Sequence, residues 1–141
     1  MYAAEHALAA PERIAIAMAG GRTRASVTYA QLEARANQLA HLLRRIGLER
    51  GDHLAIASSN GIPMLEVEAA AERTGAYYTL LNTHLAPAEV AYVLQDATAR
   101  VMFASPDLVA SVDAAARRCP RIEARFVLAP SSAVHGWRPL A

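Results

Sequence analysis

The chain has 141 residues, of which 54% are hydrophobic and 19% charged, and its formal net charge is +1. A disordered protein is poorer in apolar residues and further from neutrality, so this composition predicts a folded chain, and its length fits one domain. Cys119 is the only cysteine, which excludes a disulfide within the chain and a zinc site built from several cysteines.

Neither a membrane helix nor a secretory signal is visible in the sequence. The longest stretch without Asp, Glu, Lys or Arg has 15 residues, from Thr74 to Ala88, whereas a membrane helix needs about 20 mostly apolar residues. The first six residues lack the basic patch and apolar core of a secretory signal. We therefore expect a soluble, cytoplasmic protein.

All 14 basic residues are arginine, which excludes any mechanism that depends on a lysine. Five of these arginines lie in residues 117–141, where Glu123 is the only acid. Cations at a helix C-terminus explain Arg117 and Arg118, and the segment lacks the exposed aromatics of a nucleic-acid surface. We expect no nucleic-acid partner.

The first third of the chain predicts a helix, a hairpin and a longer helix. A short helix over residues 3–10 ends at Pro11, and strands over 14–18 and 23–27 flank a Gly20-Gly21 turn. Thr28 and Gln31 then form the pattern of a capping box. The helix that follows has one apolar stripe and ends at Gly47; the stripe consists of Leu32, Ala36, Leu39, Leu43 and Ile46.

The remaining residues alternate between apolar strands and helices. Strands begin near His53, Tyr77, Arg100 and Arg125. Helices are predicted over 62–74, over 87–97, and from Ser105-Pro106 to just before Pro120. This pattern predicts an α/β fold, with helices packed on a largely parallel sheet and a short antiparallel hairpin before it. Residues 129–141 have no periodicity and predict an unstructured or linker-like end.

Few residues are candidates for a ligand site. Ser58-Ser59-Asn60-Gly61 follows a strand and fits a helix cap better than a phosphate-binding turn. Asn82 and His84 also follow a strand, where open parallel sheets place ligands, although a loop histidine bonded to nearby backbone is the favoured interpretation of His84. Asn60, Asn82 and His84 are therefore kept as candidate residues at the edge of a pocket.

The other polar side chains favour structural roles. The acidic side chains Glu66, Glu68 and Glu72 indicate a solvated helix face beside Arg73, and Asp52 indicates a turn. Cys119 lies on an apolar stripe, which favours an inert thiol. The five histidines show no metal-binding spacing. We assign no catalytic, cofactor-binding or metal-binding residue.

Five segments, in order, resemble the N-terminal region of acyl-CoA synthetases (fatty-acid–CoA ligases) of the adenylate-forming enzyme superfamily. They are HALAAPERIAI, VTYAQLEARANQLAHLLRRIGLERGDHLAI, SSNGIPMLEVEAAAERTGAYYTLLNTHL, AEVAYVLQDATARVMFAS and RFVLA. The resemblance covers roughly residues 6 to 128. It implies that residues 1–128 are an N-terminal α/β subdomain, an incomplete piece of a larger domain.

The resemblance also implies the activity of a longer parent enzyme. That enzyme would use ATP and Mg²⁺ to convert a carboxylic acid, of the fatty-acid type, into an acyl-adenylate, from which coenzyme A displaces AMP. The family's glycine-rich phosphate loop, ribose-binding aspartate and C-terminal lysine are absent from this sequence. We therefore expect no cofactor in this chain, no activity in isolation, and self-association through sheet surface left open. A free-standing binding or regulatory module is the alternative.

Overall fold

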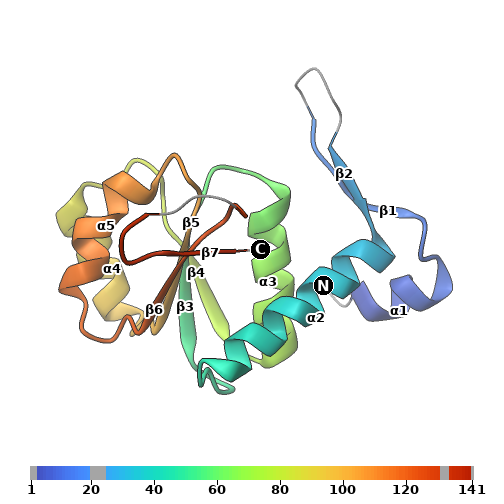
Figure 1. Cartoon of the computed structure of the whole chain (residues 1–141), viewed down its shortest axis with the longest axis horizontal. Helices are drawn as coiled ribbons and strands as arrows, with labels where there is room; N and C mark the ends of the chain where they lie inside the picture. Colours follow the sequence, from blue (N-terminus) through green and yellow to red (C-terminus); the bar gives the residue numbers. More distant parts are fainter. Residues whose placement is uncertain (1–2, 20–24, 131–133, 141) are drawn as a thin grey trace. The chain divides into compact units, whose positions relative to one another are not determined.

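The computed structural model describes residues 3–19, 25–130 and 134–140, which form two compact units. The first unit comprises residues 1–49 and 60–75, and the second comprises residues 50–59 and 76–141. Figure 1 shows the helices and strands of both. In the described part of the chain no helix is long and apolar enough to cross a membrane.

The first unit contains the predicted hairpin and three helices. Its elements are α1 (Ala3–Ala9), β1 (Ile14–Ala17), β2 (Ser26–Thr28), α2 (Tyr29–Arg45) and α3 (Ile62–Thr74). Strands β1 and β2 pair antiparallel, which confirms the hairpin, whereas the predicted Gly20-Gly21 turn lies outside the described residues.

Helix α2 begins and ends as its sequence predicts. The backbone N–H of Gln31 donates to Thr28 Oγ1 over 3.3 Å, and the backbone N–H of Thr28 donates to Gln31 Oε1 over 3.0 Å. This reciprocal pair satisfies two helix-end donors. Gly47 has φ +84°, and the Leu48 N–H bonds the Leu43 carbonyl over 3.0 Å. A left-handed residue after the last turn therefore closes the helix.

The apolar stripe of α2 is buried except at its end, where Ile46 is half-buried. Two ion pairs join α2 to α3 at its side. Arg35 Nη1 lies 2.5 Å from Glu66 Oε1, and Arg73 Nη2 lies 2.5 Å from Glu33 Oε2. Glu66 is only 8% exposed, so the prediction that it belongs to a solvated face is wrong. Helical spacing does not show which glutamate faces a neighbouring helix.

The second unit is a parallel sheet with two helices on it. Its elements are β3 (His53–Ala57), β4 (Tyr77–Leu80), α4 (Pro87–Asp96), β5 (Val101–Ala104), α5 (Val109–Arg118), β6 (Ala124–Val127) and β7 (Arg138–Pro139). The strand order is β4-β3-β5-β6-β7, and every neighbouring pair is parallel. The structure confirms the α/β class and the largely parallel sheet.

The core of the second unit lies between this sheet and the pair α4 and α5, which Figure 1 shows side by side. All four residues of β5 are buried, in agreement with the sequence, in which this strand is apolar at every position. Met102 and Ala104 of β5 pack in the cluster with Leu94 of α4 and Val112 of α5. Burial of these apolar side chains therefore stabilises the strands that the apolar runs of the sequence predict.

Two predictions need correction here. Helix α5 begins at Val109, not at Ser105, because residues 106–108 form a turn whose Leu108 and Val109 N–H groups bond the Ser105 carbonyl. Residues 134–140 are not an unstructured end. Val134 and Trp137 form a bridge, β7 pairs with β6, and Trp137 is 4% exposed. Burial of one large side chain orders a segment that has no periodic pattern.

Candidate functional site

A polar cluster joins the carboxyl ends of two neighbouring strands, β3 and β5. Ser59, two residues after β3, donates from Oγ to Asp107 Oδ2 over 2.6 Å, and its backbone N–H lies 3.4 Å from Ser105 Oγ. Ser105 is buried, and Asp107 is exposed in the turn before α5. In open parallel sheets ligands bind at this edge, which makes the cluster a candidate functional site.

The cluster holds one ionised carboxylate. Hydrogen bonds from Ser105 and Ser59 hold the pKa of Asp107 below its ordinary value, against a smaller opposing effect of burial. The Ser59 hydroxyl donates to this carboxylate and the Ser105 hydroxyl accepts from the Ser59 N–H, and no hydrogen bond joins either hydroxyl to a histidine in the part of the chain that the structure describes. The geometry supports a tie between two loops and does not provide an activated nucleophile.

Two of the candidate pocket-edge residues lie in one turn after β4. The backbone N–H of His84 donates to Asn82 Oδ1 over 2.9 Å, and the N–H of Leu85 bonds the Asn82 carbonyl over 3.2 Å. Both residues are exposed. The sequence predicts that the His84 imidazole bonds nearby backbone, but it is the backbone of His84 that makes the bond. The asparagine side chain therefore shapes the turn.

Asn60 belongs to the first unit, where it precedes α3 in an exposed bend. The N-cap of α3 is Gly61, in an extended conformation and without a side-chain hydrogen bond, and Pro63 lies within the first turn. The prediction that a polar side chain of residues 58–61 caps this helix is therefore wrong. Gly61 takes the N-cap position, and Pro63 has no N–H, so one fewer donor at this helix end needs a partner.

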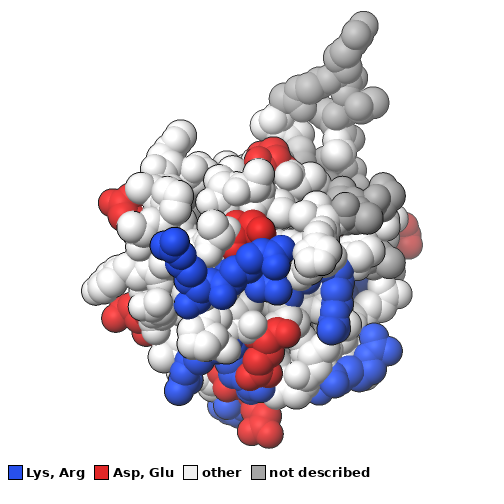
Figure 2. Space-filling view, turned by 60° about the vertical axis from the view of Figure 1, so that its left-hand side comes forward, with Lys and Arg blue, Asp and Glu red and all other residues white. Residues whose placement is uncertain are grey.

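Among the arginines of residues 117–125, Arg117 and Arg125 make contacts near the end of the chain. Arg117 Nε lies 2.8 Å from Asp113 Oδ2, one turn earlier in α5. Figure 2 brings the α5 side of the molecule forward and shows several basic side chains (blue) close together there.

Cys119 follows α5 and is 3% exposed, and burial raises the pKa of its thiol above the ordinary value, in agreement with the predicted inert role.

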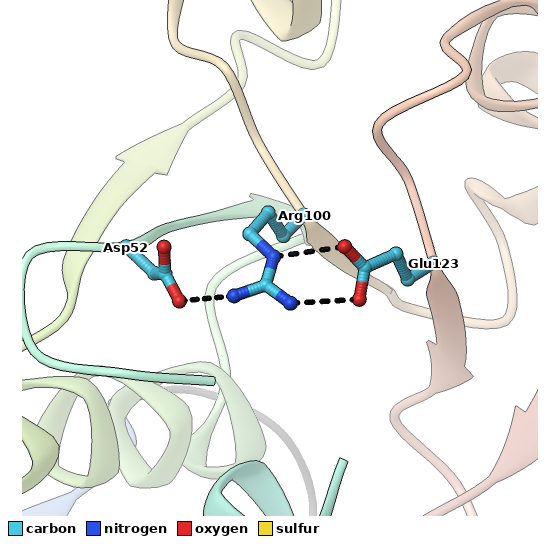
Figure 3. A network of polar contacts seen from close by, with 3 residues as sticks. All are labelled: Asp52, Arg100 and Glu123. Carbon is cyan, nitrogen blue, oxygen red and sulfur yellow. Dashed lines mark hydrogen bonds and ion pairs between the residues drawn. The ribbon is translucent and has the colours of Figure 1, made fainter. Parts of the chain in front are cut away.

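At the amino ends of three strands, Arg100 bonds two carboxylates (Figure 3). Its Nε and Nη2 donate to the two carboxylate oxygens of Glu123 over 2.9 and 2.8 Å, and its Nη1 bonds Asp52. Asp52 precedes β3, Arg100 precedes β5 and Glu123 precedes β6. The sequence prediction of a simple turn at Asp52 misses this network, because strand register brings the three residues together and no local motif marks them.

Arg100 and Glu123 form a bidentate ion pair, and Asp52 adds a second negative charge beside Arg100. The hydrogen bonds with Glu123, followed by those with Asp52, raise the pKa of Arg100 despite its partial desolvation. The same bonds hold the pKa of Glu123 below its ordinary value. The network lies at the edge opposite to the ligand-binding edge of such sheets, and its arrangement fits alignment of the strands.

The described residues do not assemble a metal centre. Within residues 3–19, 25–130 and 134–140, no group of three or more His, Cys, Asp or Glu side chains is placed to hold an ion. The chain also lacks lysine. We therefore assign no residue to Mg²⁺ or to a nucleotide.

Comparison with known proteins places these features in a family. The family described as AMP-binding enzyme matches residues 3–137. Among curated proteins, a 3-oxocholest-4-en-26-oate–CoA ligase from Rhodococcus rhodochrous is 41% identical over 93 residues, or 65% of this chain and 16% of the relative. A long-chain-fatty-acid–CoA ligase from Thermus thermophilus is 32% identical over 110 residues, or 78% of this chain and 20% of the relative.

Solved structures show the same likeness. A structure described as a long-chain-fatty-acid CoA ligase from Rhodopseudomonas palustris matches 97% of this chain and 33% of its own, with TM-score 0.86 and 28% identity. The N-terminal domain of FACL13 from Mycobacterium tuberculosis matches 98% of this chain and 32% of its own, with TM-score 0.77 and 25% identity. The chain thus spans about a fifth or less of the two curated relatives described above. It belongs to the family of AMP-binding enzymes and resembles the N-terminal region of its acyl-CoA ligases.

Proposed function

We propose that this chain is the N-terminal portion of an ATP-dependent, AMP-forming acyl-CoA synthetase, and that it contributes scaffold rather than reacting groups. The observation that carries the proposal is the family match over residues 3–137. In the proposed reaction a carboxylic acid reacts with ATP in the presence of Mg²⁺ to give an acyl-adenylate and pyrophosphate. The thiol of coenzyme A then displaces AMP and forms the thioester.

The acid is proposed to be a fatty acid. Relatives named long-chain-fatty-acid–CoA ligases, from Mycobacterium tuberculosis and Thermus thermophilus, support this choice. Other relatives are named for 3-oxocholest-4-en-26-oate and for 3-hydroxybenzoate, and an assay with several carboxylic acids distinguishes these acyl groups. We place the reaction in the cytoplasm, without a nucleic-acid partner.

The isolated chain is proposed to be inactive. It has no lysine and no glycine-rich phosphate loop, and such groups are what stabilise the charge that develops during phosphate chemistry. We assign residues 1–128 to the N-terminal subdomain of the parent. Asn60, Asn82 and His84 remain candidates for the edge of a pocket that the parent would complete.

An isolated piece of a larger domain is also expected to associate with itself. Tyr77 and Leu80 of β4, at one end of the sheet order, are 61% and 49% exposed. Large apolar side chains on an edge strand favour contact with a second copy. The opposite end of the order, β7, carries Arg138 and Pro139, which are residue types that discourage such pairing.

Two experiments test this proposal. The DNA that follows codon 141 is sequenced, and the product of the full reading frame is assayed. We expect a frame that encodes a glycine-rich loop and a later lysine, and a product that makes acyl-CoA from a fatty acid, ATP and coenzyme A. A frame that stops at codon 141, with a product that binds a nucleotide or an acyl chain saturably, would instead support the free-standing binding module.

A further inference from the structure

Two arginine side chains from different elements converge on one glycine of the second unit. Arg117, at the end of α5, donates from Nη2 to the His135 carbonyl over 2.7 Å, and Arg125, in β6, donates from Nε to the Gly136 carbonyl over 3.1 Å. A Cβ atom placed on Gly136 would lie 3.1 Å from Arg117 Nη2 and 3.4 Å from Arg125 Nη2. The two guanidinium groups therefore approach the same side of Gly136.

This pair of cations has one carboxylate beside it. Asp113 accepts from Arg117 Nε through Oδ2, and its Oδ1 accepts from Trp137 Nε1 over 2.7 Å. Arg125 forms no ion pair with any described residue, and its Nη1 and Nη2 have no hydrogen-bond acceptor among them. Among the described residues, two positive charges thus face one negative charge, and Nη1 and Nη2 of Arg125 have no acceptor.

We propose that Arg117 and Arg125 form a binding site for a phosphate group, on the side of Gly136 that both guanidinium groups approach. A guanidinium presents N–H donors in a planar fork that matches phosphate oxygens, and such charge-assisted bonds are among the strong ones. A tetrahedral anion can accept from two guanidiniums that arrive from different directions. Its charge also offsets the repulsion between two cations that backbone carbonyls hold close together.

The glycine is part of this arrangement. Gly136 has φ +82°, a conformation that side chains rarely adopt. A Cβ atom there would lie tightly against Arg117 Nη2 and in ordinary contact with Arg125 Nη2, so Gly136→Ala is expected to strain the turn and to push the Arg117 guanidinium slightly away. This site lies away from the Ser59–Asp107 cluster in sequence and contacts, and it does not depend on the proposed ligase function.

The test is a calorimetric titration of the purified chain with inorganic phosphate and, separately, with methyl phosphate, at constant ionic strength set with chloride. We expect saturable binding with a Kd on the order of 1 mM, and a phosphate-dependent rise in the melting temperature, because a ligand that binds only the folded state stabilises it. Binding of methyl phosphate as well as inorganic phosphate would show that the site admits a phosphate monoester, and binding of inorganic phosphate alone would show that it takes only the free anion.

Variants separate this site from general attraction to a basic surface. Arg125→Gln is expected to weaken binding about tenfold or more, and Arg125→Lys, which keeps the charge and loses the fork, to weaken it by a smaller factor. Arg121→Gln is the matched control, since Arg121 is exposed and makes no described contact. Melting temperatures without phosphate show that each variant is folded. No saturable binding by the folded wild type, or equal weakening by Arg121→Gln and Arg125→Gln, would overturn the proposal.

Discussion

The indole Nε1 of Trp137 donates a hydrogen bond to Oδ1 of Asp113 over 2.7 Å, and so joins the last described segment to α5. Burial alone raises the pKa of Asp113, but hydrogen bonds from Arg117 and Trp137, together with the charges of Arg117 and Arg125, hold it below its ordinary value. The ionised Asp113 carboxylate thus accepts hydrogen bonds both from Arg117 in its own helix and from Trp137 in the last described segment.

Replacing this acceptor should loosen the end of the chain. Asp113→Asn removes the negative charge that strengthens both hydrogen bonds, and we expect a loss of about 1.5–3 kcal/mol in the free energy of unfolding, the range for hydrogen bonds to a charged group. Urea unfolding followed by tryptophan fluorescence measures it, because Trp137 is the only tryptophan.

Asp96→Asn provides the control for this change. Asp96 is exposed at the end of α4, where an acid faces the negative end of the helix dipole. Its removal should leave stability unchanged or slightly higher. Equal destabilisation by Asp96→Asn and Asp113→Asn would contradict a specific role for the Trp137–Asp113 bond.

Much of this fold follows from the sequence, and the exceptions share a physical cause. The strand runs near His53 and Val101 are apolar on both faces, so local pattern alone predicts central parallel strands. The partner of Glu66 and the network of Arg100 depend on how separate elements pack or register, which no local pattern encodes. Trp137 could have indicated that residues 134–140 are ordered, because a large aromatic side chain tends to be buried even in a segment without a periodic pattern.

The Arg100 network predicts a dependence of stability on pH. The hydrogen bonds from Arg100, opposed by slight desolvation and aided by its charge, lower the pKa of Glu123 in the folded state from the ordinary 4.5. The contribution of this group to stability is therefore complete above pH 4.5 and is lost as the pH falls through the folded-state pKa. Glu123→Gln should make the decline of the free energy of unfolding below pH 4.5 shallower, as measured by urea unfolding at several pH values.

The same substitution in an Arg100→Gln background tests the cause. If the ion pair lowers the pKa of Glu123, then Glu123→Gln should add little change in slope once Arg100 is gone. An equal change in slope with and without Arg100 would show that another group is responsible.

The exposed side chains of β4 predict association of the isolated chain. Sedimentation equilibrium should show an average mass that rises with protein concentration, and Leu80→Arg should shift this rise to higher concentration because a charge on an edge strand opposes pairing. Leu8→Arg is the control, since Leu8 is 87% exposed on α1, a helix outside the sheet. A wild-type chain that stays monomeric at high concentration would exclude the proposed association.

We propose that this chain contributes structure to an acyl-CoA synthetase and lacks the groups that perform its chemistry. AMP formation by the purified 141-residue chain with ATP, Mg²⁺, coenzyme A and a series of fatty acids tests this proposal, with a full-length relative as the positive control. We predict no acid-dependent AMP above the level without protein. Acid-dependent AMP that co-purifies with the chain, and is absent from a parallel preparation of an unrelated protein, would contradict the claim.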